Sequence, residues 1–193
     1  MVCVNNDGTT SEEWTPLSVG LYKFNADKAY VVTISRNGVG KKTPVSEYKK
    51  LQKLCKLKEG DKLAYVFSAN DEDNILIRSQ DNKICKVKVA DIKLSGKLTI
   101  GVKIVGFIIA DACLTNDYFY TINADNQIKR CEVEDLTRST VGLNDGCTHI
   151  GSCDLHTVYW SRGKFTPFDW SKISVKSRTS DGAKIANSEI RIC

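Results

Sequence analysis

The sequence predicts an all-β protein built from about four copies of one hairpin unit. Three observations support this: short alternating apolar segments, a polar turn after each of them, and a nearly constant distance between the turns. The equivalent turn positions are Gly38, Asn82, Asn126 and Gly163, which gives spacings of 44, 44 and 37 residues. A period of this length is typical of a repeat protein rather than of a single irregular core.

Each unit begins with a segment rich in β-branched and aromatic residues, as strands usually are. These segments cover residues 29–34, 74–77, 118–122 and 157–160. Asn37-Gly38, Asp81-Asn82 and Asp125-Asn126 follow the first three and suit a two-residue type I′ turn, because these residue types tolerate positive φ. Arg162-Gly163 suits the fourth turn less well.

A second apolar signal follows each turn. Ten residues after the turn stands Tyr48, Ile92, Leu136 or Ile173, and three residues earlier stands Val45, Val89, Val133 or Trp170. Units of this size, with three or four short strands, are typical of propeller blades, which bury both faces by stacking. The predicted blades cover approximately 29–72, 73–116, 117–156 and 157–193.

Residues 1–28 predict a partial or strand-swapped blade. Asp7-Gly8 resembles a turn, and Pro16-Leu17-Ser18 repeats the pattern of Pro44-Val45-Ser46, but the spacing is too short for a full unit.

A helical period occurs over residues 48–57, where Tyr48, Leu51, Leu54 and Leu57 are spaced by three. The interpretation is a short solvated helix or turn between blades; a phosphate-contacting segment and a membrane-surface helix remain as alternatives.

Composition and the N-terminal sequence predict a folded intracellular protein. Hydrophobic residues make up 41% and charged residues 26%, which is ordinary for a folded soluble protein. The N-terminus has no secretory pattern, and the most apolar stretch, residues 104–110, is too short to cross a bilayer. We therefore expect a cytoplasmic protein with no membrane partner, and eight cysteines that are reduced and mostly buried.

The segment Arg36-Asn37-Gly38-Val39-Gly40-Lys41-Lys42-Thr43-Pro44-Val45-Ser46-Glu47-Tyr48 resembles the blade signature of the C-terminal domain found in the A subunits of type IIA DNA topoisomerases, gyrase and topoisomerase IV. Lys58-Glu59-Gly60-Asp61 resembles the family's link into the next strand. The first repeat matches strongly, the second and third match in pattern and length, and the fourth matches loosely. The resemblance implies a β-pinwheel, a propeller-like disc whose blades exchange strands and whose basic rim bends DNA.

Two departures from the family limit what the resemblance implies. The gyrase box is absent, and Gln52-Lys53-Leu54 is the nearest segment, so chiral wrapping is not implied. The family's cleavage motif is an arginine followed by the nucleophilic tyrosine, and none of the seven tyrosines follows an arginine. The expected protein is therefore no enzyme, needs no cofactor, and would act with a separate topoisomerase core.

Charge differs between the repeats. The net charge is +5 overall, with −2 for residues 1–28 and +4, +3, −4 and +4 for the four repeats in order. Because affinity for duplex comes mainly from neutralised phosphates, we expect contacts on the first, second and fourth repeats. The candidate DNA-binding residues are Arg36, Lys41, Lys42, Lys49, Lys50, Lys53, Lys83, Lys86, Lys88, Lys164 and Lys172.

Nothing in these basic clusters predicts base readout, so the expected partner is double-stranded DNA bound without sequence preference. Strand alternation places Lys86 and Lys88 on one face, with Cys85, Val87 and Val89 on the other. For each candidate DNA-binding residue, the alternative is a solvated surface side chain without a DNA contact.

Both histidines and two cysteines fall within residues 147–156. Cys147, His149, Cys153 and His156 are the residue types that hold zinc, although their spacing matches no common finger. If Gly146 is aligned with Gly60, Cys147, His149 and Cys153 fall on one face of a strand at packing positions. Core packing is the preferred interpretation, so no metal site is predicted; a cysteine–histidine nucleophile is weaker still.

The function predicted from sequence is therefore a non-enzymatic module that binds and bends DNA through basic blade edges. The acidic third repeat and the missing gyrase box favour one alternative, a stand-alone propeller-like adaptor for a protein partner or small ligand.

Overall fold

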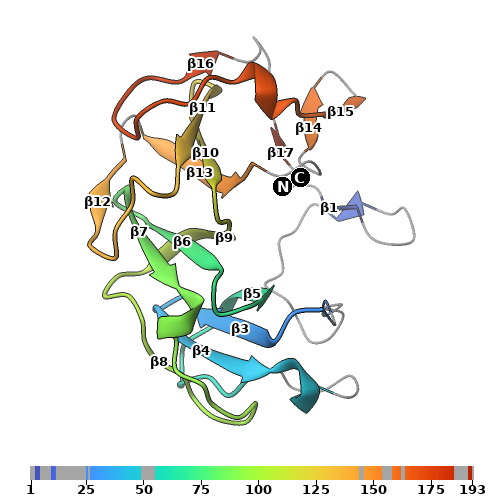
Figure 1. The fold of residues 1–193 in the computed structure, drawn as a ribbon, viewed down its shortest axis with the longest axis vertical. Helices are drawn as coiled ribbons and strands as arrows, with labels where there is room; N and C mark the ends of the chain where they lie inside the picture. The colour runs from blue at the N-terminus through green and yellow to red at the C-terminus, as the bar shows by residue number, and fades with distance from the viewer. Residues whose placement is uncertain are drawn as a thin grey trace. The chain divides into compact units, whose positions relative to one another are not determined.

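The computed structural model describes residues 3–4, 10–11, 25, 27–48, 55–143, 146–153, 158–161, 164–184 and 191–192. Within these residues its regular secondary structure is strands and three single turns of 3-10 helix (Figure 1). The strands are β1 Cys3–Val4, β2 Thr10–Ser11, β3 Tyr30–Ser35, β4 Val39–Pro44, β5 Leu63–Ala69, β6 Asn74–Ser79, β7 Lys83–Lys88, β8 Val102–Lys103, β9 Ile109–Leu114, β10 Tyr118–Asn123, β11 Gln127–Glu132, β12 Val141–Gly142, β13 Cys147–Ser152, β14 Val158–Ser161, β15 Lys164–Pro167, β16 Ala183–Lys184 and β17 Arg191–Ile192.

The chain divides into two compact units. The first unit contains Pro16–Asn116 and Leu136–Gly142, and the second contains Met1–Thr15, Asp117–Asp135 and Leu143–Cys193. No helix among the described residues has the length and apolar character needed to cross a membrane.

Strand exchange organises the sheets in each unit. The first unit holds the sheets β5-β3-β4-β8 and β9-β6-β7-β12, which we call the first and second sheets. The second unit holds β13-β10-β11-β16, the third sheet, and the three-stranded β17-β14-β15. In the first three sheets the last strand comes from the chain after the next hairpin; for example, β8 follows β7 but pairs with β4. We call these donated segments crossovers.

The strand exchange and the all-β repeat confirm the predicted pinwheel architecture. The short pair β1-β2 lies on either side of the predicted Asp7-Gly8 turn, which is outside the described residues.

The loops of the first three hairpins differ from the predicted type I′ turn. Each loop has three residues, 36–38, 80–82 and 124–126, and only the last one has positive φ: 77° at Gly38, 56° at Asn82 and 58° at Asn126. That residue donates its N–H to the carbonyl three positions earlier, for example Gly38 to Ser35 at 3.0 Å. The prediction was wrong by one residue because this turn, followed by a left-handed residue, satisfies the same Asn/Gly preference.

Three of the four paired hydrophobes spaced by three residues form single turns of 3-10 helix. These turns cover Val45–Glu47, Val89–Asp91 and Trp170–Lys172. In each turn the second hydrophobe donates its N–H to the carbonyl of the first, as Ile92 does to Val89 at 3.1 Å. The pattern marks the point where the chain leaves the hairpin. The helix considered over residues 48–57 falls largely outside the described residues.

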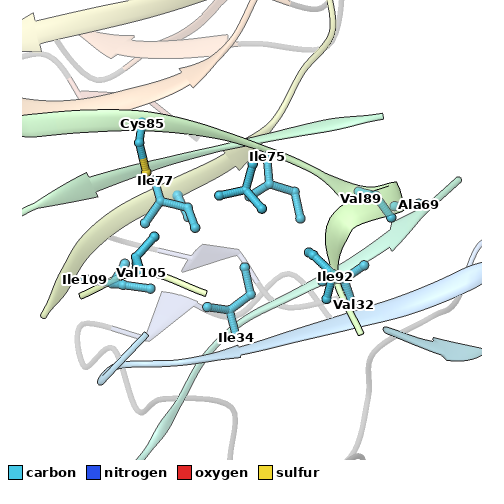
Figure 2. Packing of buried hydrophobic residues seen from close by; sticks show 12 residues of the cluster. Val32, Ile34, Ala69, Ile75, Ile77, Cys85, Val89, Ile92, Val105 and Ile109 are labelled. Atoms are coloured by element: carbon cyan, nitrogen blue, oxygen red, sulfur yellow. The ribbon is translucent and has the colours of Figure 1, made fainter. Parts of the chain in front are cut away.

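The core of the first unit lies between its two sheets. Figure 2 shows Ile75 and Ile77 of the second sheet facing Val32 and Ile34 of the first. The crossover residue Val105 and the β9 residue Ile109 close one end of this core. Packing the two sheets against each other removes their apolar side chains from water, and this burial stabilises sheets that have two apolar faces.

The second unit has a core of its own. Tyr120, Ile122 and Ile128 of the third sheet pack with Phe168 and Trp170. The Tyr120 and Trp170 rings stack with centroids 5.0 Å apart.

Candidate nucleic-acid interface

Lys41 is buried, although its sequence context suggested a surface cation. It lies in β4, is 1% exposed, and donates from Nζ to the carbonyls of Gly96 at 2.6 Å and Lys97 at 2.7 Å. Burial lowers the pKa of its ammonium below the ordinary value. The side chain therefore holds the crossover in place and has no ammonium to offer a phosphate.

Lys42 is buried on the opposite face. It is 6% exposed, and its ammonium pairs with Asp71, donates to the carbonyls of Val89 and Ala90, and lies 4.9 Å from the centre of the Tyr30 ring. The hydrogen bond from Lys42 lowers the pKa of Asp71. The expectation that Lys41 and Lys42 contact phosphate from the surface is therefore corrected, because both side chains are buried and both ammoniums donate to acceptors inside the fold.

The second unit repeats this arrangement at Lys129 and Arg130 of β11. Lys129 is buried, and its ammonium donates to the carbonyls of Arg178 at 2.7 Å and Ser180 at 2.6 Å. Arg130 lies 4.7 Å from the Tyr118 ring and donates to the Trp170 carbonyl at 2.9 Å.

Exposed cations gather at the loop end of the first sheet. Arg36 begins the β3–β4 loop, and its N–H donates to the Lys62 carbonyl at 2.8 Å. Lys103 of β8 pairs with Val39 and donates from Nζ to the Asn37 carbonyl at 2.8 Å. We define the loop-end cluster by the exposed residues Arg36, Lys58, Lys62 and Lys103.

Two carboxylates accompany the loop-end cluster. Asp61 is occupied by local hydrogen bonds, since it accepts from Ser35 Oγ at 2.6 Å and from the N–H of Asn37 at 3.2 Å. Glu59 is exposed. Four cations against two carboxylates leave a net positive surface. Of the four, only Arg36 was a candidate from sequence; Lys103 could have been found only by recognising that the crossover returns to β4.

The β7 lysines have mixed surroundings. Lys83 pairs with the exposed Asp81 at 2.6 Å, and hydrogen bonds from Lys83 and Ser79 lower the pKa of Asp81 to about 2. Lys88 is exposed and Lys86 is half-buried, while Cys85 and Val87 are buried. The predicted alternation along β7 is confirmed, and a phosphate role for Lys83, Lys86 and Lys88 stays a prediction.

In the second unit, Lys172 is exposed and pairs with Asp169 at 3.1 Å. The crossover of the third sheet carries two further lysines. The Lys176 ammonium donates to the Asp181 carbonyl at 2.9 Å, and Lys184 of β16 is exposed. Lys164 lies in β15, but its side chain falls outside the described part, as do Lys49, Lys50 and Lys53 altogether. Their assignment as DNA contacts stays a prediction.

Cys147 and His149 lie on β13 but do not share a face. Cys147 is buried and His149 is exposed, because a bulge shifts the register between Ile122 and Asn123 of the neighbouring strand. The predicted shared packing face is therefore wrong for His149. The structural equivalents of Cys147 and His149 are Leu63 and Tyr65, two residues away from the expected alignment.

Cys153 is half-buried, and His156 falls outside the described residues. Within the described part of the chain no three cysteine, histidine, aspartate or glutamate side chains are grouped as metal ligands.

The third repeat presents its acidic charge outward. Asp117, Asp125, Glu132, Glu134 and Asp135 are all exposed. This surface repels a polyanion, in keeping with the expectation that DNA contacts do not lie on this repeat.

Comparison with known proteins identifies the relatives of this fold. Residues 29–70 match the family described as DNA gyrase C-terminal domain, beta-propeller. The chain is 30% identical over 86 residues to the DNA gyrase A protein of Kosmotoga olearia, covering 41% of this chain and 11% of that protein. The chain resembles the gyrase A C-terminal domain. The resemblance expected from the segment around Gly38 is thus confirmed.

Solved structures extend the resemblance from sequence to fold. The C-terminal domain of DNA topoisomerase IV superposes with a TM-score of 0.64 at 16% identity, covering 86% of this chain and 59% of that one. A DNA gyrase A C-terminal domain gives 0.65 at 13% identity, covering 95% and 67%. The chain has the fold of these domains, and it spans about a tenth of the length of the gyrase A proteins it matches.

Proposed function

We propose that this chain is a non-enzymatic module that binds duplex DNA through its phosphates and bends it. The observation that carries the proposal is the sequence match to the gyrase C-terminal domain over the same blade that presents the loop-end cluster. Duplex is a dense polyanion, and lysine and arginine side chains displace its condensed counterions. Sequence-tolerant binding follows, because the exposed cations carry no arrangement suited to base edges.

The loop-end cluster is the primary contact in this proposal. Arg36, Lys58, Lys62 and Lys103 project from adjacent segments of the first sheet, so one stretch of backbone can meet all four. Lys88 of the second sheet and Lys184 of the second unit are secondary contacts. Lys41 supports the interface indirectly, by fixing the crossover that carries Lys103, and Lys42 fixes the 3-10 turn that precedes this crossover.

The protein partner in this proposal is a topoisomerase core that performs cleavage and receives the bent duplex. The chain itself supplies no chemistry, and the cytoplasm is the compartment where such a core acts. The thiols of Cys55, Cys85, Cys113, Cys131, Cys147 and Cys153 are free, which suits a reducing compartment.

A salt titration of duplex binding tests the proposal. With the full chain and an unrelated-sequence duplex, we expect log K to fall linearly with log salt, with a slope near −4 if four phosphates are neutralised. Arg36→Gln/Lys103→Gln is expected to reduce the slope by about 2 and to weaken binding at least tenfold at low salt. Thermal unfolding should be unchanged, since both side chains are exposed.

The matched comparison is Lys83→Gln/Lys172→Gln, which changes the net charge equally at lysines paired with Asp81 and Asp169. We expect a smaller loss, because a lysine that is already paired with a carboxylate is less available to a phosphate. Absence of duplex binding by the wild-type chain at low salt would refute the proposal.

One observation favours a second function, an adaptor for a protein partner. The third repeat exposes five carboxylates, a charge suited to a basic protein partner. An adaptor would keep its fold without DNA affinity, so the same titration separates the two functions.

A further inference from the structure

The crossover of the first sheet exposes an unusual strip of apolar side chains. Leu94, Leu98, Ile100 and Val102 are exposed, and Leu98 reaches 63%. Scattered single hydrophobes need no explanation, but four within nine residues on one surface segment indicate a contact.

The charged side chains of the strip itself are all cationic, and the Glu47 carboxylate that reaches its turn accepts the Lys97 N–H. Between Ile92 and Ala110 the sequence holds three lysines, Lys93, Lys97 and Lys103, and no aspartate or glutamate. An occupant that offers negative charge beside an apolar surface therefore complements the strip. Duplex DNA does so, with phosphates along the edge of the groove and stacked bases behind them.

Leu98 occupies the apex of a turn that is held rigidly. Thr99 donates to the Gly96 carbonyl from its N–H at 3.1 Å and from Oγ1 at 2.7 Å. The Lys41 ammonium donates to the carbonyls of Gly96 and Lys97, and the Lys97 N–H donates to Glu47 Oε2 at 3.0 Å. A flexible loop would fold its leucine away, whereas this turn keeps the leucine outside.

The sheet supports the turn from beneath. Thr43 Oγ1 donates to the Ser95 carbonyl at 2.8 Å, and the Ser95 N–H donates to the Lys42 carbonyl at 2.9 Å. Unstacking a base step is energetically costly, so the backbone that carries an inserting side chain must hold its position.

We propose that Leu98 is a wedge that inserts between base pairs and kinks the duplex, with Lys97 and Lys103 contacting the flanking phosphates. This inference rests on the proposed function and adds to it the residue that bends DNA. A membrane surface is the competing occupant. A single leucine on a tight turn gives it a small apolar face, since interfacial binding usually uses the broad face of an amphipathic helix.

The test measures bending separately from binding. The full chain is titrated into a short duplex with fluorophores at its ends and 2-aminopurine within it, at constant low salt. Wild type is expected to shorten the end-to-end distance and raise the 2-aminopurine emission. Leu98→Ala should lose more than about 20° of bend, the smallest kink that such wedges produce.

A mismatched duplex gives a second readout. Its step is already partly unstacked, so we expect wild type to bind it about tenfold more tightly than matched duplex, and Leu98→Ala to lose that preference. Ile108→Ala is the matched control, because Ile108 is 47% exposed but lies beyond β8. Lys103→Gln should lower the salt dependence while leaving the bend angle unchanged.

The outcomes are distinct. If Leu98→Ala binds and bends duplex like wild type, the wedge is overturned while the proposed function stands. If wild type binds no duplex at low salt, the proposed function fails and the wedge fails with it. If Leu98→Ala keeps the bend but loses binding to anionic phosphatidylserine vesicles, the strip is a membrane surface and the wedge is overturned.

Discussion

The crossovers that cover the first and second sheets differ in one feature, and that feature accounts for the buried lysine. Both begin alike: the N–H of Lys42 donates to the Lys93 carbonyl at 3.1 Å, and the N–H of Lys86 donates to the Thr137 carbonyl at 2.9 Å. Both end alike, with Lys103 opposite Val39 and Gly142 opposite Lys83. Between these points the first crossover has five more residues, and they include the turn at Gly96.

The residue beneath the crossover follows its length. Lys41 lies beneath the long crossover and donates to two of its turn carbonyls, whereas Cys85 occupies the equivalent position beneath the short one. In the second unit, Lys129 again accompanies a crossover with a turn, at residues 177–180. A buried cation is tolerated where a turn supplies carbonyl acceptors, and a small apolar thiol suffices where it does not.

Removing the extra turn should give the largest effect. Deletion of residues 96–100 makes the first crossover as short as the second and leaves the Lys41 ammonium buried without its acceptors. We expect a loss of about 4 kcal/mol or more in the free energy of unfolding, measured by urea titration. Combining the deletion with Lys41→Cys should restore about 2 kcal/mol.

A double-mutant cycle tests whether Lys41 and the turn are energetically coupled. Lys41→Cys alone, the deletion alone and the combination are compared with wild type. If the single effects add within about 0.5 kcal/mol, the turn and the lysine are independent and the comparison of the two crossovers loses its meaning.

The substitution Lys41→Met measures how much the ammonium alone contributes to the free energy of unfolding. Methionine keeps much of the apolar stem but leaves the carbonyls of Gly96 and Lys97 without this donor, so we expect a loss of about 2–3 kcal/mol. Lys88→Met, at an exposed position of β7, should change stability by less than about 0.5 kcal/mol. A gain in stability for Lys41→Met would show that lysine burial costs more than its hydrogen bonds return.

The burial of Lys41 and Lys42 marks the limit of what the sequence could predict. The strands and the paired hydrophobes depend on spacings shorter than about fifteen residues, and the repeat was readable because the same local pattern recurs at a nearly constant distance. The carbonyls that accept from Lys41 lie 55 and 56 residues away, on a segment whose apolar character gave no strand signal. Strand alternation points one of two adjacent lysines into the core. The other would meet solvent on the opposite face of the sheet, but the crossover covers that face.

His149 illustrates a second limit. Its exposure follows from the bulge opposite Ile122 and Asn123, and a bulge adds a residue without a clear sequence mark. The loop-end cluster was partly predictable, because Arg36 follows a recognisable strand, whereas Lys103 reaches the cluster only through strand exchange.

The backbone of the long crossover packs so closely on β4 that we expect Gly101 not to tolerate a side chain. A Cβ on Gly101 would lie 2.3 Å from the Gly40 carbonyl oxygen, and one on Gly96 would approach nothing nearer than 3.8 Å. Gly101→Ala should therefore lower the free energy of unfolding by about 1–3 kcal/mol. Gly96→Ala serves as its control in the same thermal denaturation series and should remain near wild type; equal values for the two would contradict the packing.

Alkaline pH should weaken the fold through its buried thiols. Burial raises the pKa of Cys85 and of Cys131 from 9.0 to about 11. The unfolded chain then loses protons before the folded one does, so this stabilisation is complete below pH 9 and is lost as pH rises through 11. Cys85→Ala should reduce the fall in stability over this window by about 1–2 kcal/mol. An unchanged pH dependence in urea titrations would contradict it.

The smallest predicted effect is a gain in the second unit. Its crossover turn has the exposed Thr179 where the first unit has Leu98, on a turn closed by the Ser180 N–H donating to the Ser177 carbonyl at 3.2 Å. If a leucine on a pinned turn is what kinks duplex, Thr179→Leu in a Leu98→Ala chain should restore part of the end-to-end shortening and strengthen binding a fewfold. Thr179→Ala should restore nothing, since it adds no side chain long enough to enter a base step. Equal bending by the two variants would mean that bending comes from phosphate contacts alone.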